Sequence, residues 1–170
     1  MKLNIGAGGR KYEGFTNVDI VARQGVDIVA EMSKIPLPDA SAEEIMAIHV
    51  VEHVHSWEVP IALKEWNRLM KSGGRLILEL PDIIKCCKNL LHGVMLGGKH
   101  PHQLSYWGIY GDDRARDPFM QHKYGWTFKT LKPLVSAAGF ENIHEAETQF
   151  HPCGRNSRDF RLEARKPLNV

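Results

Sequence analysis

Strand-like and helix-like runs alternate along the 170-residue chain, and this alternation constrains the fold more than any other feature. Apolar or β-rich runs with strand character occupy residues 2–5, 17–20, 26–30, 44–50, 75–80, 142–147 and 160–166. Alternating strands and helices form a mostly parallel sheet that is covered on both faces. We therefore predict an α/β fold with a mostly parallel seven-stranded sheet, helices on both faces and an antiparallel terminal hairpin.

Three segments have helical character. In the first, Ser56 is a plausible N-cap, Pro60 fits only near the start, and Gly73 with Gly74 would end the helix. The other two are predicted at residues 83 to about 95 and 127–138. No composition shift divides the chain, so a single domain over residues 1–170 is expected.

The opening stretch from Leu3 to Ile20, LNIGAGGRKYEGFTNVDI, contains two predicted strands joined by too few residues for an ordinary crossover helix. Gly6 and Gly8 directly follow the first strand, where glycine permits a tight turn and close approach of a ligand. Asp19 ends the second strand, and its carboxylate could accept hydrogen bonds from both hydroxyls of a ribose. A nucleoside ligand is therefore expected at the carboxyl ends of the strands.

A dinucleotide is a poorer fit to this stretch. The G-x-G-x-x-G fingerprint requires glycine at position 11, where this chain has Lys11. Gly8 and Asp19 are only 19 − 8 = 11 positions apart, whereas the dinucleotide pattern has its acidic residue about 20 residues on. A nicotinamide-dependent reductase is therefore the less favoured alternative.

Four segments together resemble the class I S-adenosylmethionine-dependent methyltransferases, in particular small ones with an L-N-x-G-x-G opening followed by G-F/W-x-N-V-D. The opening matches at Leu3, Asn4, Gly6, Gly8, Gly14, Phe15, Asn17, Val18 and Asp19. The later segments are HVVEHV at 49–54, EWNRLMKSGGRLILELPD at 65–82 and FKTLKPLVSAAGFENI at 128–143. Many members carry an acidic residue where this chain has Asn4, and a proline where it has Ser72.

The resemblance implies a Rossmann-like class I methyltransferase fold and S-adenosylmethionine as cofactor, and it assigns roles in binding that cofactor. The glycine turn would face the methionine part and Asp19 the ribose, while Glu31 and Met32 would contact adenine. His49 and Val50 would lie near the methyl group. The short crossover also brings Arg10 or Lys11 near the methionine carboxylate, although both could be solvated loop cations. The predicted cofactor site comprises Asn4, Gly6, Ala7, Gly8, Arg10, Asp19, Glu31, Met32, His49 and Val50.

Catalysis of methyl transfer requires positioning, and it requires a general base only when the acceptor must lose a proton. The candidate catalytic residues are His49, His53, Tyr106 and His122, with further histidines at positions 100 and 102. Each histidine could instead be an ordinary hydrogen-bonding residue, and Glu52 with His53 could cap the following helix. No third ligand accompanies the sequence HPH at a recognised spacing, so no metal site is predicted.

Residues 97–126 have no clean periodicity and are rich in glycine and aromatic residues. Long segments of this kind are usually functional, and we interpret this one as a lid over the acceptor. Its aromatic residues could alternatively pack the segment onto the sheet; they are Tyr106, Trp107, Tyr110, Tyr124 and Trp126.

Composition excludes several classes of partner. A formal net charge of +2 without a run of basic residues does not indicate a nucleic-acid interface. No apolar run is long enough to span a membrane and no signal peptide is evident, so a cytoplasmic protein is expected. The three cysteines, Cys86, Cys87 and Cys153, are interpreted as reduced structural thiols.

The predicted activity is methyl transfer to a small-molecule or sugar-type acceptor. The alternative is a non-catalytic S-adenosylmethionine-binding module that keeps the fold. The oligomeric state stays open, with a homodimer as one option.

Overall fold

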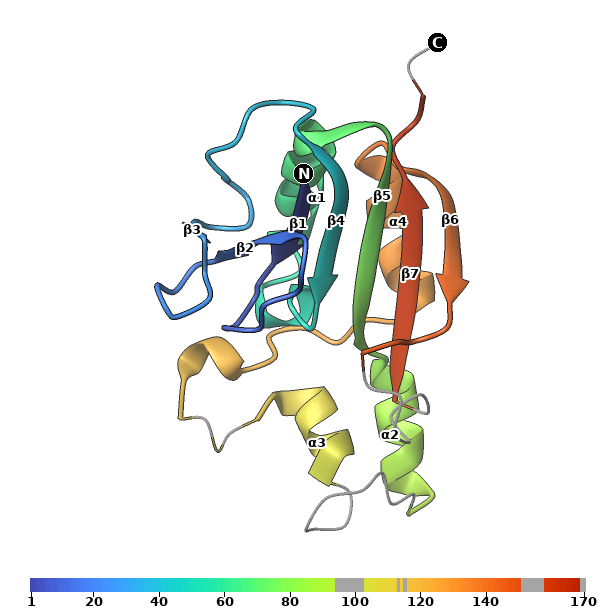
Figure 1. Ribbon diagram of the computed structural model, residues 1–170. Coiled ribbons are helices and arrows are strands. Elements are labelled where there is room, and N and C mark those ends of the chain that lie inside the picture. Colours follow the sequence, from blue (N-terminus) through green and yellow to red (C-terminus); the bar gives the residue numbers. More distant parts are fainter. Residues whose placement is uncertain (94–102, 113, 115, 151–157, 169–170) are drawn as a thin grey trace.

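The computed structural model describes residues 1–93, 103–112, 114, 116–150 and 158–168, and places the strands in one twisted sheet (Figure 1). Its seven strands have the order β3-β2-β1-β4-β5-β7-β6. They are β1 (Lys2–Ile5), β2 (Phe15–Asp19), β3 (Ile28–Val29), β4 (Ala42–Ile48), β5 (Met70–Pro81), β6 (Glu141–Ala146) and β7 (Asp159–Arg165).

Among the strands that the structure describes, β7 alone runs against the others. The pairs β1–β2, β1–β4, β2–β3 and β4–β5 are parallel, whereas β7 pairs antiparallel with both β5 and β6. The predicted mostly parallel, seven-stranded sheet with an antiparallel terminal hairpin is therefore confirmed. The helices are α1 (Val59–Leu69), α2 (Ile83–Leu91), α3 (Gln103–Tyr110) and α4 (Phe128–Ala137), with short 3-10 turns η1 (Val51–His53) and η3 (Pro118–Met120).

Three predicted helix boundaries differ from the structure. Helix α2 ends at Leu91 rather than near residue 95, and the other two are the ends of α1. The N-cap of α1 is Glu58 rather than Ser56, and the Glu58 carboxylate accepts a hydrogen bond from the His55 amide at 2.8 Å. Gly73 and Gly74 do not end the helix, because β5 already begins at Met70. The two glycines lie within β5, where the pairing of β5 with β4 is irregular and Gly73 has a φ of +76°.

The two faces of the sheet are covered differently (Figure 1). Helices α1 and α4 pack on one face, where Trp66, Leu63 and Leu131 are fully buried in the main core. On the opposite face Met46, Ile48 and Ile77 form a smaller apolar cluster. In the described part of the chain aromatic side chains pack on that cluster, and α2 and α3 lie beyond the carboxyl ends of the strands. The expected helical cover is therefore seen on one face.

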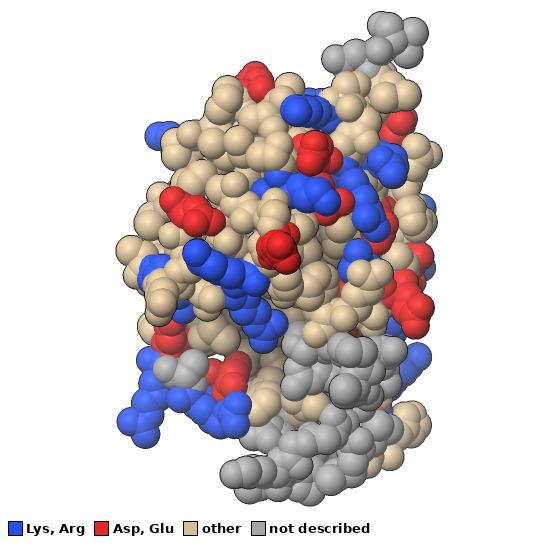
Figure 2. Space-filling view, viewed as in Figure 1, with Lys and Arg blue, Asp and Glu red and all other residues tan. Residues whose placement is uncertain are grey.

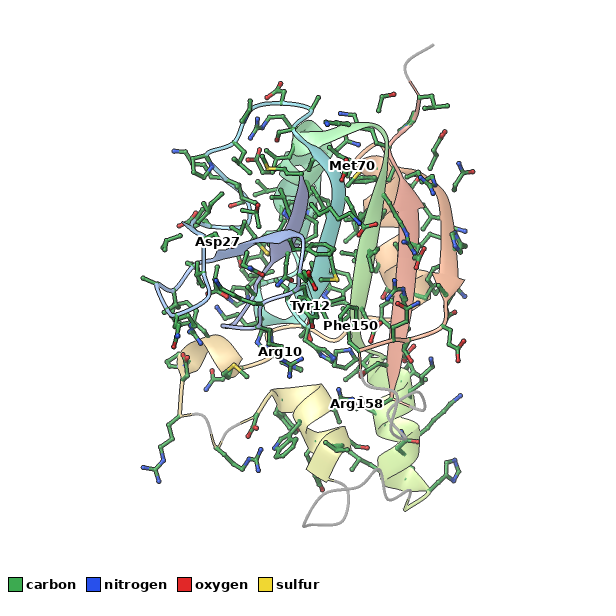
Figure 3. The ribbon with its side chains drawn as sticks, in the orientation of Figure 1. Arg10, Tyr12, Asp27, Met70, Phe150 and Arg158 are labelled. Atoms are coloured by element: carbon green, nitrogen blue, oxygen red, sulfur yellow. The ribbon has the colours of Figure 1, made fainter. Side chains whose placement is uncertain are left out.

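The connection from β1 to β2, residues 6–14, contains no helix and supplies part of this aromatic cover. The ring of Tyr12 lies edge-on to Phe15 at 6.3 Å and to Phe150 at 5.3 Å between centroids. Figure 3 shows Tyr12 and Phe150 side by side across the lower part of the sheet. Tyr12 thus occupies the face that a crossover helix usually covers.

The strand order reverses between β1 and β4, because the chain builds β2 and β3 on one side of β1 before it crosses to β4. In open α/β sheets this reversal creates a crevice at the carboxyl ends of the strands. The fold therefore places the glycine turn after β1 beside the end of β4.

The surface carries mixed charge on the face shown in Figure 2, where Lys and Arg are largely interspersed with Asp and Glu. Among the described helices, none is long and apolar enough to cross a membrane.

Candidate functional site

A pocket of about 730 Å³ lies at the point where the strand order reverses. Four strand ends contribute to it, together with α3 and the segment after α3. All ten predicted cofactor residues line this pocket: Asn4, Gly6, Ala7, Gly8, Arg10, Asp19, Glu31, Met32, His49 and Val50. The structure thus brings the set together, and the role of each in binding a cofactor stays a prediction.

The glycine turn after β1 is shaped by its backbone. Gly6 has a φ of +68°, and a Cβ at this position would overlap the side chain of Val50. Gly8 has a φ of +57° and faces open space, since the nearest atom to a Cβ there would be 3.9 Å away. A side chain at Gly6 would therefore disturb the fold, whereas a side chain at Gly8 would mainly occupy space at the pocket.

Asp19 holds this turn in place. One carboxylate oxygen accepts a hydrogen bond from the Gly8 amide at 2.8 Å, and the other accepts one from the Val21 amide at 2.9 Å. A carboxylate oxygen can accept more than one hydrogen bond, so Asp19 retains capacity for ribose hydroxyls. Asp19 therefore has a structural role in addition to its predicted one.

Asn4 takes part in a buried amide network below the turn. Its Nδ2 donates to Asn17 Oδ1 at 2.9 Å and to the Arg10 carbonyl at 3.3 Å. Asn17 donates through its backbone amide and its Nδ2 to Asp27, and these bonds lower the pKa of the Asp27 carboxyl. A carboxylate at position 4 could not donate these bonds. The amide therefore serves to anchor the short crossover.

Arg10 and Lys11 point to different surroundings. Arg10 lines the pocket and lies near the lower ends of the strands in Figure 3. The aliphatic part of Lys11 lies against the loop after β2, close to Gly25, and its charge helps to lower the pKa of Asp27. Of the two cations considered for the methionine carboxylate, the geometry favours Arg10.

His49, at the end of β4, is held between two buried carboxylates. Its Nδ1 lies 3.0 Å from Glu52 Oε1 and its Nε2 lies 3.4 Å from Asp159 Oδ2. Burial alone would lower the pKa of His49, but the two carboxylates outweigh it and raise the pKa to about 9. His49 is therefore a fixed cation at neutral pH and not a free general base.

The ionic contacts continue from His49 to α3. Burial opposes ionisation of Asp159, but His49 and Arg158 hold its carboxyl pKa well below the usual range. Arg158 Nε lies 2.7 Å from Asp159 Oδ1, and its Nη1 donates to the Leu104 carbonyl at 3.0 Å. Sequence reasoning missed Arg158 and Asp159 and considered Glu52 only as a cap, because no local pattern links β7 to the end of β4.

The other predicted catalytic residues fall in two places. His53 and His122 line the pocket, with ring centroids 4.6 Å apart, and burial lowers the pKa of His122. Tyr106 is half exposed and does not line the pocket.

Glu52, His53 and His122 each place a potential metal-ligating atom within 4.8 Å of the others, a grouping that the sequence spacing did not predict. His100 and His102 lie outside the described residues.

The segment predicted as a lid contains a helix, α3, and the turn η3 in its described part. Trp107 lines the pocket and has the guanidinium of Arg114 3.9 Å from its ring centroid. Trp126 instead belongs to the main core, where its Nε1 donates to the Val51 carbonyl at 3.4 Å. The packing alternative therefore holds for Trp126, whereas Trp107 is placed to contact a ligand.

The cysteines lie apart from the pocket where they are described. Cys86 is buried and Cys87 is exposed, and Cys153 lies outside the described residues. Burial raises the pKa of the Cys86 thiol to about 12.

The environment of His49 generates a prediction about pH. In chelator-treated protein at about pH 8, NMR of the ring nitrogens should show His49 protonated, since its pKa is raised to about 9. The folded protein holds the His49 proton more tightly than the unfolded chain does, so this proton stabilises the folded state. The stabilisation has its full value below pH 6.5 and is lost as pH rises through about 9. In the His49→Asn variant the free energy of unfolding should therefore fall less steeply between pH 6.5 and about 9 than in the parent. The His144→Asn variant, changed at an exposed site, should behave like the parent. Titration of His49 near its ordinary value would contradict the prediction.

Comparison with known proteins bears on this pocket. Residues 14–78 match a family model described as a methyltransferase domain, so the match includes β2 to most of β5 but not the glycine turn itself. No curated protein sequence matches the chain.

Solved structures share the fold over almost the whole chain. A methyltransferase from Thermotoga maritima, described as a possible histamine N-methyltransferase, has 18% identity and a TM-score of 0.67, covering 97% of this chain and 81% of its own. A Methanosarcina mazei methyltransferase has 19% identity and a TM-score of 0.64, and the match covers 99% of this chain and 92% of that protein. The 1,6-didemethyltoxoflavin N1-methyltransferase of Burkholderia thailandensis, solved with S-adenosylhomocysteine, has 16% identity and a TM-score of 0.63. The match covers 98% of this chain and 70% of that protein. Residues 14–78 therefore match a methyltransferase domain, and the chain has the same fold as these S-adenosylmethionine-dependent methyltransferases.

Proposed function

We propose that the protein transfers a methyl group from S-adenosylmethionine to a small-molecule or sugar-type acceptor. The observation that carries the proposal is the pocket at the strand-order reversal, where the glycine turn, Asp19 and the end of β4 meet. The methyltransferase-domain match and the structural neighbours support S-adenosylmethionine as the cofactor.

In this proposal the cofactor lies across the carboxyl ends of β1, β2 and β3. Asp19 accepts hydrogen bonds from the ribose, Met32 forms an apolar wall for adenine, and the Arg10 guanidinium pairs with the methionine carboxylate. A guanidinium suits this role because its planar N–H groups match a carboxylate. The sulfonium then lies toward His49 and Val50.

Methyl transfer from a sulfonium is an in-line displacement, so much of the acceleration comes from holding the acceptor in line with the methyl group. His49 is fixed by Glu52 and Asp159 and acts as a positioning residue at the floor of the pocket. In this proposal the acceptor side comprises Trp107, His53 and His122, which also line the pocket. Trp107 can cover an acceptor and exclude water.

Ligand specificity provides the first test. S-adenosylmethionine and S-adenosylhomocysteine should raise the melting temperature and NAD should not, since a ligand at 100 times its Kd stabilises by ~2.7 kcal/mol. Gly8→Ala should weaken S-adenosylhomocysteine binding at least about tenfold by calorimetry, or ~1.4 kcal/mol, because its methyl group enters space at the pocket. Gly14→Ala is the matched control, since Gly14 also has a positive φ, of +79°, with no atom within 4 Å of a Cβ. Equal affinities for the two variants would place the ligand elsewhere.

A second test concerns the methionine carboxylate. Arg10→Ala should weaken binding of S-adenosylhomocysteine by about 10-fold or more, as expected for a charge-assisted hydrogen bond. Binding of methylthioadenosine, which lacks the carboxylate, should change little. Lys11→Ala should affect neither ligand, because Lys11 lies against the loop near Gly25. Equal losses for both ligands in the Arg10 variant would refute this role.

The third test separates the acceptor side from the cofactor side. Trp107→Ala should leave S-adenosylhomocysteine affinity within about threefold, or ~0.6 kcal/mol, and abolish turnover with a transferable acceptor identified by screening. Tyr106→Ala, one position away but outside the pocket, should retain turnover. A tenfold or larger loss of cofactor affinity in the Trp107 variant would move Trp107 to the cofactor side. A protein that binds the cofactor and turns over no acceptor in the screen would favour the non-catalytic alternative.

A further inference from the structure

Glu52, His53 and His122 come from distant parts of the chain and meet at the pocket. Glu52 and His53 belong to η1, directly after β4, whereas His122 follows η3. Backbone bonds join the two segments, since the amides of Lys123 and Tyr124 donate to the Glu52 carbonyl at 2.7 and 3.3 Å. The meeting of these side chains is therefore built into the backbone.

Both histidines present the same ring geometry. The Nδ1 of His53 lies 3.2 Å from the Gln121 carbonyl, and the Nδ1 of His122 lies 3.0 Å from the Gly108 carbonyl. A carbonyl only accepts, so in the neutral form of each ring Nδ1 carries the proton and Nε2 has the lone pair. Donation of one ring N–H to a backbone carbonyl is the usual outer-sphere arrangement of metal-ligating histidines.

Glu52 supplies an anionic oxygen that lacks a protein partner. Its side chain is only 2% exposed, and one oxygen, Oε1, is 3.0 Å from His49 Nδ1 and 3.9 Å from His122 Nε2. The other oxygen, Oε2, is buried and has no hydrogen-bond partner among the described residues. A buried, unsatisfied carboxylate oxygen is costly, and a cation bound to the carboxylate would offset this cost by neutralising its charge.

We propose that Glu52, His53 and His122 form a binding site for a divalent transition metal ion of the zinc class. Two histidines and one glutamate form the protein ligand set of one type of catalytic zinc site, which keeps a further position open. His53 and His122 line the pocket, so the open position faces it. The candidate ligating atoms lie within 4.8 Å of one another, and bonds of about 2.0–2.2 Å require the side chains to draw closer around the ion.

This site adds to the proposed function without depending on it. A metal ion bound here would offer its open position to water or to an oxygen or nitrogen atom of the acceptor. Hard and borderline donors of this type are suitable ligands for zinc. The site would therefore select acceptors that carry a ligating atom next to the methylated position.

Co²⁺ titration of tag-free, chelator-treated protein tests the proposal directly. We expect one equivalent of Co²⁺ to bind with visible absorption bands typical of a low-symmetry site, and Zn²⁺ to displace it. Glu52→Gln, His53→Gln and His122→Gln should each weaken binding by at least about 10- to 100-fold, the loss usual even for outer-sphere partners. His144→Gln is the control, because His144 is exposed and its Nδ1 also faces a carbonyl, that of Asn142 at 2.9 Å. It should bind like the parent.

The experiment remains decisive if one variant folds poorly. His122 is nearly buried, whereas His53 is partly exposed, so His53→Gln gives a test less prone to misfolding, with circular dichroism as the check. Absence of saturable one-equivalent binding, or equal binding by the three ligand variants and the parent, would overturn the site. S-adenosylhomocysteine affinity is measured on the same samples. Metal binding without cofactor binding would refute the proposed function alone, and the reverse would refute the metal site alone.

Discussion

A line of alternating charges, most of them buried, connects the end of β4 to α3, on the proposed acceptor side of the pocket. It runs from Glu52 through His49 and Asp159 to Arg158, and ends at the Leu104 carbonyl in α3. Each charge in the line lies beside one of opposite sign, which offsets the large cost of removing ions from water. Loss of one member would leave its neighbour buried and unpaired, so the placement of α3 depends on the whole line.

This ionic line has a consequence for His49. The residue has a φ of +55°, which is uncommon outside glycine and asparagine, and its ring is bound on both nitrogens. Both its backbone and its side chain are therefore fixed at the end of β4. A histidine held in this way provides a constant shape and charge at the pocket, whereas His53 and His122 each have one ring nitrogen next to a backbone carbonyl.

The short crossover affects the other face of the sheet. With no helix between β1 and β2, Tyr12 packs against Phe15 and Phe150 over Met46 and its neighbours. Phe150 is itself positioned by buried Glu79, whose Oε1 accepts its backbone amide at 2.9 Å. The buried Glu79 is paired in turn with Arg161 at 3.3 Å. Aromatic packing and a buried ion pair thus replace a helix, and they leave the glycine turn directly beside the pocket.

The sequence allowed accurate prediction of the first strand and of the residues at the ends of the parallel strands. Residues 2–5 were predicted as a strand and form β1, and the glycines and Asp19 lie at the pocket because strand ends of a parallel sheet meet at one edge. The start of β5 was not predicted, because Gly73 and Gly74 are typical of a helix end but here lie in an irregular strand. Ser56 likewise is a residue type that commonly caps helices, yet the helix begins later, at Val59.

The acceptor side was predicted less well for a physical reason. Its geometry depends on contacts between residues far apart in sequence, such as Arg158 with Leu104 and His122 with Glu52. Such pairs leave no periodicity or spacing in a single sequence. The segment around Tyr106 was predicted from composition alone, and composition could not distinguish Trp107, which lines the pocket, from Trp126, which is in the core.

The two sides of the pocket therefore differ in how they are held. On the cofactor side, the turn after β1 is fixed by backbone amides bound to Asp19 and to the Val18 carbonyl, within residues close in sequence. On the proposed acceptor side, α3 is held by bonds between residues farther apart in sequence, including Arg158 to the Leu104 carbonyl and His122 to the Gly108 carbonyl. Elements outside a sheet open more readily than strands embedded in it. Substitutions in α3 and around His122 can therefore reshape the acceptor side while the glycine turn and Asp19 keep their geometry, which allows one fold to serve different acceptors.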